Sequence, residues 1–321
     1  MNCKFESLFA QRICAFIEQK HRLGFPYSVS EYHLSHFDRF CVERFPNEVA
    51  LTKEIVLAWA VKRDTEQNNG FRNRLSPVRE FAKYLNRIGE MAYVIPTHYV
   101  RRSARPTPYI YSETEIAVIW RILDETKPCP EYPTRHLVIP AIIRLLYCCG
   151  LRPGEACKLM TDDVNLKTGK IFIRESKGHK DRIVMLADDI LALCRRYNEK
   201  MQIIMPGREA FFPNEKGQAY SKIWFSSVFR KYWNETGFPQ FGANPPRVYD
   251  FRHTFATHRL HQWMLEGKNL SSCLPYLSAY LGHVLLSDTA YYIHLIPSFF
   301  KESPEVVGFH KCERLLPEVG E

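Results

Sequence analysis

The stretch Arg247-Val248-Tyr249-Asp250-Phe251-Arg252-His253-Thr254-Phe255-Ala256-Thr257-His258 begins a helix around which the rest of the chain can be interpreted. Two prolines end the preceding segment, and Asp250 has the side chain of an N-cap residue. At about 100° per residue, the apolar side chains fall on one face, with Arg252 in its middle and Arg259 intruding. That face consists of Phe251, Phe255, Ala256, Leu260 and Trp263.

Arg252 is a charged residue on an apolar face, and its charge has to be satisfied. A guanidinium does not lose its proton in a protein, so a buried one needs an anion or an exit to solvent. Arg252 also lies in the first helical turn, where free N–H groups and the helix dipole favour a negative ligand. A core carboxylate would serve equally well, so a structural ion pair and a bound anion both remain open.

The composition favours a partner that carries negative charge. The chain has 321 residues, which is long for one domain, and its 44 Lys and Arg against 35 Asp and Glu give a formal charge of +9. Nucleic acid is the simplest polyanion for such a basic protein. We therefore expect two domains and a nucleic-acid partner.

The ten cysteines lack the spacing of a metal site or of a secreted scaffold. No CxxC pair occurs, and Cys148 and Cys149 are adjacent, so we expect reduced thiols and no metal. The first residues lack the apolar core of a signal peptide, and the most apolar segment, 137–149, is too short to span a bilayer. The sequence predicts a cytoplasmic protein that makes no membrane contact.

Residues 1–95 have the periodicity of four short helices, and we interpret them as a helical N-terminal domain. Residues 96–109 follow with three prolines and three arginines but no helical period, which is typical of an extended interdomain linker. We expect the linker arginines to contact DNA phosphates, although a simple tether would have the same composition. These arginines are Arg101, Arg102 and Arg105.

Residues 110–296 are predicted to form a second, mainly α domain with a small antiparallel β-sheet. Ser112 opens it with a capping box, and Pro153 suits the first position of a helix, which leaves Arg152 at the N-cap. Arginine cannot accept from the free N–H groups there, so an external anion would satisfy both. Asp188 is expected to cap a further helix, and other helices are expected to begin at Ser221 and at Asn269 or Ser271.

Two segments of this domain alternate in polarity like β-strands, 170–175 and 182–185. Residues 176–181 between them form a basic hairpin tip. Lysines at such a tip are ordinarily a solubility device. In a protein that binds DNA they also carry charge away from the helical core, and we expect Lys180 and Arg182 to contact DNA.

Four stretches of the second domain occur together and in order. They are Gly150-Leu151-Arg152-Pro153-Gly154-Glu155, Ser176-Lys177-Gly178-His179-Lys180-Asp181-Arg182, the stretch from Tyr249 to His258, and Leu281-Gly282-His283 followed by Tyr292. With this order and spacing they resemble the motifs of the tyrosine recombinase (phage integrase) family. The resemblance covers roughly the last two thirds of the chain, and a weaker one links residues 1–95 with that family's core-binding domain. It implies a two-domain, C-shaped clamp around duplex DNA.

The resemblance implies a role for each motif residue. Arg152 and Arg252 would clamp the scissile phosphate, and His283 would donate a further hydrogen bond to it. Lys177 would protonate the leaving 5′ oxygen, and Tyr292 would attack phosphorus to give a 3′-phosphotyrosine. Because this intermediate keeps the bond energy, the reaction would need neither a cofactor nor a metal.

Two neighbours of the clamp residues complete the predicted site. Glu155, one helical turn after Arg152, would orient that arginine. Tyr249 stands where the family usually has histidine, and a phenol with an ordinary pKa of about 10 is a weak base at neutral pH. Tyr249 would still hydrogen-bond the phosphate or the nucleophile, so the sequence leaves the identity of the general base open.

Tyr291 is the rival of Tyr292 for the role of nucleophile. Adjacent helical residues point about 100° apart, so only one of them faces the phosphate. The spacing from His283 favours Tyr292, and we expect Tyr291 to pack. His253 and His258 are expected to be packing or surface histidines.

The sequence predicts a site-specific recombinase that acts as a homotetramer on paired DNA sites, with accessory DNA-binding proteins as further partners. Its role would be the integration or excision of a mobile element, or the resolution of replicon dimers, at the nucleoid. A type IB topoisomerase-like enzyme and a DNA-binding relative without catalysis are the alternatives. The apolar tail, 297–321, would dock either on its own domain or on a neighbouring protomer.

Overall fold

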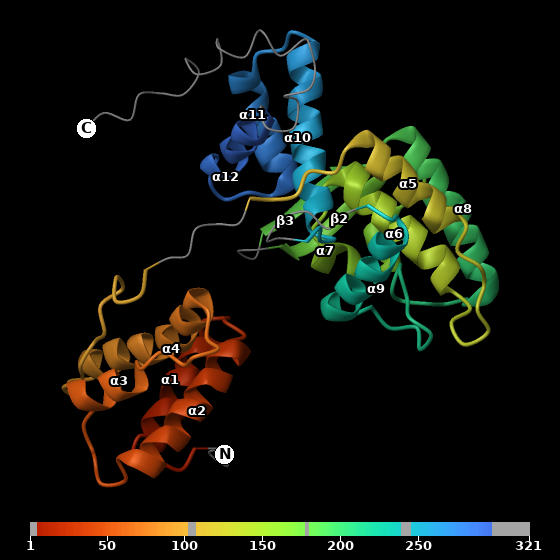
Figure 1. The fold of residues 1–321 in the computed structure, drawn as a ribbon. Helices are drawn as coiled ribbons and strands as arrows, with labels where there is room; N and C mark the ends of the chain where they lie inside the picture. Colours follow the sequence, from red (N-terminus) through yellow and green to blue (C-terminus); the bar gives the residue numbers. More distant parts are fainter. Residues whose placement is uncertain (1–4, 102–106, 177–179, 239–244, 297–321) are drawn as a thin grey trace. The chain divides into compact units, whose positions relative to one another are not determined.

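The computed structural model describes residues 5–101, 107–176, 180–238 and 245–296. The chain divides into two compact units, residues 1–105 and 106–321 (Figure 1). Each unit has a hydrophobic core of its own. The predicted class, mainly α with a small antiparallel sheet, is confirmed.

Within the described residues the first unit is made of helices only. Thr52 caps the third of them, because its Oγ1 accepts from the backbone N–H of Ile55 at 3.4 Å. The faces turned inward carry a core rich in Phe and Leu side chains. The helices are α1 (Ala10–Arg22), α2 (Ser28–Arg44), α3 (Lys53–Trp59) and α4 (Asn68–Arg87).

The second unit combines helices with one small sheet. In the sheet, β2 (Lys170–Ser176) pairs antiparallel with both β1 (Val164–Asn165) and β3 (Lys180–Met185), in the order β1-β2-β3. The hairpin formed by β2 and β3 confirms the two strands predicted from alternation. The helices are α5 (Glu113–Asp124), α6 (Arg135–Cys149), α7 (Pro153–Cys157), α8 (Asp188–Ile204), α9 (Lys222–Glu235), α10 (Asp250–Leu265), α11 (Leu270–Leu281) and α12 (Ser287–Ala290), with 3₁₀ turns η1 (Thr161–Asp163) and η2 (Tyr291–Leu295).

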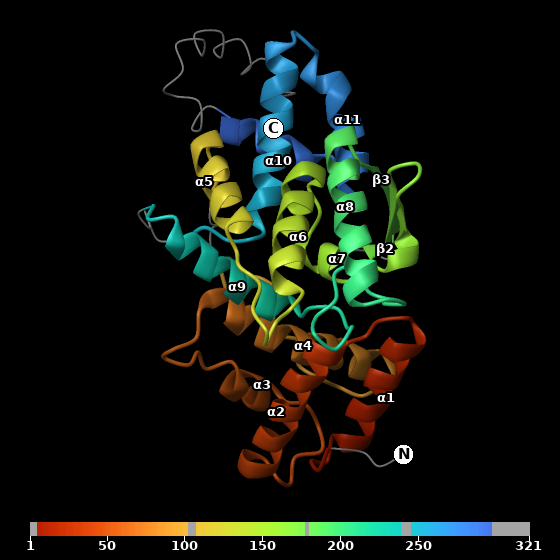
Figure 2. The same ribbon diagram turned by 90° about the vertical axis from the view of Figure 1, so that its right-hand side faces the viewer.

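Helix α6 lies at the centre of the second unit and packs against α5, α8 and α10 (Figure 2). Its Ile139, Ile142 and Leu146 are fully buried, and full burial of such a side chain contributes about 1.5–3 kcal/mol. Helix α10 also belongs to a second cluster, in which Leu260 packs with residues of α11 and η2 such as Leu281. Helix α10 therefore ties the end of α6 to the segment that carries Tyr292.

Three predicted helix starts in the second unit are confirmed. Ser112 forms the capping box that opens α5. Ser221 accepts from Trp224 N at 3.1 Å, and Asn269 accepts from Ser272 N at 3.3 Å. Each cap satisfies an N–H group that the helix itself leaves without a partner.

Two predicted aspartate caps are wrong. Asp250 and Asp188 are the first residues of α10 and α8, and Tyr249 occupies the N-cap position of α10. The buried Asp250 carboxylate instead accepts from the backbone N–H of Arg247 at 2.8 Å and pairs with its guanidinium. At Asp250 the local sequence permits either arrangement, and the arginine three residues earlier decides between them.

The cysteines require one correction. Cys14 is disulfide-bonded, whereas the sequence predicted reduced thiols throughout. Seven other cysteines of the described residues are free, and burial raises the pKa of thiols such as Cys157 to about 12.

Among the described helices, none has the length and apolar character needed to cross a bilayer. The described residues as a whole contain no cluster of three or more His, Cys, Asp or Glu side chains arranged to hold a metal ion.

Candidate active site

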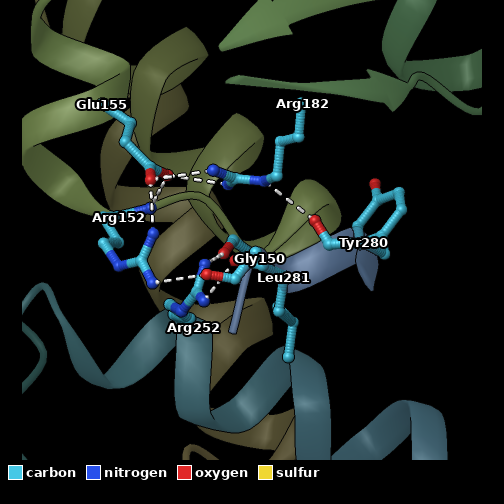
Figure 3. Close-up of polar contacts among 8 residues, drawn as sticks. Gly150, Arg152, Glu155, Arg182, Arg252, Tyr280 and Leu281 are labelled. Atoms are coloured by element: carbon cyan, nitrogen blue, oxygen red, sulfur yellow. Dashed lines mark hydrogen bonds and ion pairs between the residues drawn. The ribbon is translucent and has the colours of Figure 1, made fainter. Parts of the chain in front are cut away.

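The guanidinium of Arg252 is fully buried in the second unit, as its place on the apolar face predicts. Nη1 donates to the carbonyl oxygen of Gly150 at 2.7 Å, and Nη2 donates to that of Leu281 at 2.6 Å (Figure 3). These oxygens belong to the C-terminal ends of α6 and α11, which carry the negative end of each helix dipole. The alternative of a core carboxylate partner is wrong, because backbone oxygens hold this side chain.

Gly150 allows the end of α6 to reach the arginine. Its φ of +58° lies in the left-handed region that glycine adopts at helix C-termini. A Cβ atom at this position would lie 2.5 Å from Cδ1 of Phe255. Any larger residue would therefore push α10 away from α6 and separate Arg252 from its carbonyl partner.

Arg152 approaches the same place from the N-terminus of α7. Its Nη1 donates to Oε1 of Glu155 at 2.6 Å, and its Nη2 donates to the carbonyl oxygen of Gly282 at 3.2 Å. Its own N–H donates to Oε2 of Glu155 at 2.9 Å. The Arg152 side chain makes no cap bond to the helix, as predicted, and Glu155 instead accepts from the backbone N–H of Arg152 from one turn ahead.

Glu155 holds two arginines at once (Figure 3). Besides its bonds with Arg152, it accepts from Nη1 of Arg182 at 2.9 Å and from Nη2 at 2.8 Å. Burial raises the pKa of Glu155, but the bonds and charges of Arg182 and Arg152 outweigh burial and lower this pKa to about 2. The carboxylate is therefore charged at neutral pH, and it contacts Arg152 as the sequence predicted.

Arg182 corrects a prediction. The sequence placed it on a surface that contacts DNA, but its side chain is only 8% exposed and makes a two-pronged ion pair with Glu155. Its Nε also donates to the carbonyl oxygen of Tyr280 at 2.9 Å. Strand alternation places a residue on one face of a sheet, and here that face meets α7 and α11 rather than solvent.

Three arginines from three different elements thus bind three consecutive carbonyl oxygens at the end of α11. Arg182 of β3 binds the carbonyl of Tyr280, Arg252 of α10 that of Leu281, and Arg152 that of Gly282. We call the oxygens of residues 280–282 the carbonyl ladder. Burial, and to a lesser extent the nearby charge of Arg152, lowers the pKa of Arg252 to about 10.

His283 follows the carbonyl ladder directly. Its Nδ1 and the hydroxyl of Thr289 are 2.7 Å apart, and its ring stacks on that of Tyr292 with centroids 6.1 Å apart. Burial and the charges of Arg252 and Arg152 lower the pKa of His283 to about 4. The imidazole is therefore neutral at pH 7 and is suited to hydrogen bonding rather than to carrying charge.

Tyr292 lies in η2 with only 3% of its surface exposed. Burial raises its pKa to about 12, although the positive charge of Arg252 opposes this shift. Its hydroxyl lies 3.2 Å from Nδ1 of His253. The structure thus brings together Arg152, Arg252, His283 and Tyr292, and it adds His253, which the sequence interpretation treated as a packing or surface residue.

The two other tyrosines differ in their surroundings. The ring of Tyr249 lies 5.1 Å from that of His253, at the mouth of the site. Tyr291 packs against the cluster formed by α10, α11 and η2, as expected of a residue that supports its neighbour.

A cavity of about 560 Å³ opens beside Arg152 and Tyr249. Its lining carries cationic side chains that the sequence interpretation did not select, because isolated basic residues have no distinguishing pattern. They are Lys158, Arg174 and Lys222.

Several predicted residues are not part of this geometry. Lys177, Arg102 and Arg105 lie outside the described residues, as does the side chain of Lys180. Arg101 is described and exposed.

The geometry places the guanidinium groups of Arg152 and Arg252 close to the phenol of Tyr292. Residues 115–298 match the phage integrase family, which is more than half of the chain. The chain belongs to this family, and it is a tyrosine-type site-specific recombinase, an enzyme that breaks and rejoins DNA.

Relatives of known sequence support this assignment. The chain is 31% identical over 293 residues to the integrase/recombinase y4rE of Sinorhizobium fredii, covering 90% of this chain and 92% of that protein. It is 27% identical over 244 residues to the tyrosine recombinase XerD of Pseudomonas putida, covering 74% and 75% of the two chains.

Solved structures share the fold. The XerH site-specific recombinase bound to palindromic difH substrate has a TM-score of 0.63 at 19% identity, over 85% of this chain and 77% of that one. The Tn1549 transposon integrase in complex with transposon right end DNA also has a TM-score of 0.63, at 13% identity, over 95% of this chain and 99% of that one.

Proposed function

We propose that Tyr292 attacks a DNA phosphate that Arg152 and Arg252 hold between them, forming a 3′-phosphotyrosine. One observation carries this proposal: both arginines are anchored on neighbouring oxygens of the carbonyl ladder, beside the phenol of Tyr292. Glu155 is shared between Arg152 and Arg182, and carbonyl dipoles hold Arg252 without cancelling its charge, so the three arginines keep an excess of positive charge. A phosphodiester supplies the missing negative charge, and its developing charge in the transition state is stabilised further.

The remaining groups complete the reaction. His283 donates a hydrogen bond to the phosphate, and Glu155 orients Arg152. Lys177, which follows β2 in the sequence, protonates the leaving 5′ oxygen. The 5′-hydroxyl of a second strand then attacks the phosphotyrosine and releases Tyr292, so strand exchange proceeds without a cofactor.

The substrate in this proposal is duplex DNA with two paired sites, bound by a homotetramer in the cytoplasm at the nucleoid. The helical unit acts as the core-binding domain, and Arg101, Arg102, Arg105 and Lys180 contact phosphates. Integration or excision of a mobile element is the role that we propose, with accessory DNA-binding proteins as partners. The structural similarity to the Tn1549 transposon integrase supports this role.

Covalent capture tests the chemistry without knowledge of the target site. Purified full-length protein is incubated with a pool of randomised duplexes, each nicked so that a cleaved end diffuses away. The mixture is denatured, and protein that retains DNA is isolated and its DNA sequenced. We expect wild type to enrich one sequence and Tyr292→Phe to retain none; an equal yield from Tyr292→Phe would refute the assignment of the nucleophile.

The recovered sequence also separates the alternatives. A recombinase joins two linear duplexes that carry this sequence, whereas a topoisomerase-like enzyme relaxes a supercoiled circle and joins nothing. A DNA-binding relative without catalysis binds the duplex but leaves no adduct. The similarity to named recombinases already favours the first of these outcomes.

A further inference from the structure

His253 contacts the proposed nucleophile directly. It is the fourth residue of α10, next to Arg252, and its Nδ1 lies 3.2 Å from the hydroxyl oxygen of Tyr292. The two rings are 5.6 Å apart and inclined at 52°, so they meet through the polar atoms rather than by stacking. A chemical role for this contact deepens the proposed function and rests on it, because the contact matters for catalysis only if Tyr292 is the nucleophile.

Attack by a phenol requires a group that takes its proton, and most neighbours of Tyr292 are unsuited to this. Arg252 and Arg152 are permanently charged donors with no lone pair to offer. His283 lies face to face with the Tyr292 ring, at an interplanar angle of 21°, and its Nδ1 is paired with Thr289. Tyr249, at the position where the family usually has histidine, carries a phenol that is itself a weak base.

We propose that His253 is the general base that takes the proton of Tyr292 during cleavage and returns it during rejoining. As the phenol oxygen bonds to phosphorus, its O–H bond breaks and the proton moves to Nδ1 of His253. The bond from phosphorus to the 5′ oxygen breaks in the same displacement, and that oxygen takes a proton from Lys177. In rejoining, the incoming 5′-hydroxyl loses its proton to Lys177, and the imidazolium of His253 protonates the departing phenolate.

The electrostatics of the site agree with this direction of transfer. Burial, together with Arg247, Arg252 and His283, lowers the pKa of His253 to about 4, so its lone pair is free at neutral pH. The phenol has a pKa of about 12, so no phenolate forms before attack. Once the oxygen bonds to phosphorus, its proton becomes far more acidic than an imidazolium. The pKa of His253 thus lies below that of the free phenol and above that of the phenol oxygen bonded to phosphorus, as general base catalysis requires.

A substitution that keeps the contact but removes the basic nitrogen tests the inference. In His253→Asn the amide lies where Nδ1 lies now, so the phenol keeps a polar neighbour that does not accept a proton. The probe is a nicked duplex with the sequence recovered from wild-type adducts, and the readout is the single-turnover rate of adduct formation. We expect DNA affinity within about twofold of wild type and a rate lower by roughly 10²–10⁴-fold.

The same helix offers a matched control. Nδ1 of His258 lies 3.1 Å from the hydroxyl of Tyr147, which is the same kind of pair outside the proposed site. His258→Asn should keep its adduct rate within about threefold of wild type. Should His253→Asn melt early, His253→Gln is the second variant, and the same loss of rate is expected.

Three outcomes overturn the inference. The first is an adduct rate for His253→Asn within threefold of wild type. The second is a larger loss in Tyr249→Phe than in His253→Asn, which would make Tyr249 the base. The third is recovery of His253→Asn on a duplex with sulfur in place of the 5′ bridging oxygen. Sulfur leaves without a proton, so it relieves loss of the acid but not loss of the base. Loss of adduct in Tyr292→Phe with a normal rate in His253→Asn would reject only the role of His253.

Discussion

Replacing Glu155 by glutamine removes one charge from the site and keeps the shape of the side chain. The carboxylate now accepts from Arg152 and Arg182 and is largely shielded from solvent. Its pKa drops from an ordinary 4.5 to about 2 in the folded protein, a difference of about 2.5 units. At about 1.4 kcal/mol per unit, the charged form contributes about 3.5 kcal/mol to the free energy of unfolding at neutral pH.

The pH dependence of this contribution has a definite sign. Because the folded pKa lies below the unfolded one, the unfolded chain binds more protons between about pH 4.5 and 2. The stabilisation is complete above pH 4.5 and is lost as pH falls through 2. The difference between wild type and Glu155→Gln should therefore be constant from pH 7 to about 5 and shrink below that.

Urea unfolding followed by tryptophan fluorescence measures the effect, since four of the five tryptophans belong to the second unit. Asp124→Asn is the control in the same unit, because it breaks the ion pair of the exposed Asp124 with Arg144, which is worth at most about 1 kcal/mol. A loss below about 1 kcal/mol in Glu155→Gln would refute the claim that this carboxylate stabilises the arginine cluster. The tryptophans of the second unit are Trp120, Trp224, Trp233 and Trp263.

Three further predictions concern the same cluster. Arg252→Lys keeps the charge but loses the planar fork that binds Gly150 and Leu281, so adduct formation should slow by about 10²–10³-fold with little change in DNA affinity; a normal rate would contradict the clamp. Gly282→Ala should lower the free energy of unfolding by about 1–3 kcal/mol and also slow adduct formation, because φ is +69° and the new Cβ would lie 3.0 Å from Cδ of Arg182. Gly267→Ala, at φ +68° in open space, carries the strain alone and should leave the rate unchanged; equal rates in the two variants would argue against the Arg182 contact. The folded pKa values of His253 and His283 are both about 4, so the unfolded chain binds more protons than the folded one between pH 6.5 and 4. The melting temperature should therefore fall as pH drops from 6.5 to 4, and it should fall less steeply in His283→Asn. An equally steep fall in that variant would count against a buried, neutral His283.

The sequence predicts the parts of this site that depend on side-chain type. An arginine on the apolar face of a helix is expected to be buried with partners for its guanidinium, and Arg252 is buried as that pattern indicates. Helix starts at Ser112, Ser221 and Asn269 follow from the local chemistry of capping. The same chemistry fails at Asp250, where a competing partner, Arg247, takes the carboxylate.

The partners of the arginines could not be predicted, and the reason is physical. Every residue offers a carbonyl oxygen, so no sequence pattern marks Leu281 or Gly150 as a ligand of Arg252. The Glu155–Arg182 pair joins positions 27 residues apart, through a contact that only the packed fold creates. His253 is similar, since its contact with Tyr292 depends on how η2 packs against α10.

The carbonyl ladder has a consequence for how this protein tolerates change. Replacing the side chain of Tyr280 or Leu281 does not remove the oxygens that Arg182 and Arg252 grip, because these atoms belong to the main chain. The side chains at these positions can thus change in evolution while the hydrogen bonds to the arginines are retained. Among changes to residues 280–282, only one that moves the backbone at the end of α11 disturbs these hydrogen bonds, and it weakens the contacts of all three arginines together.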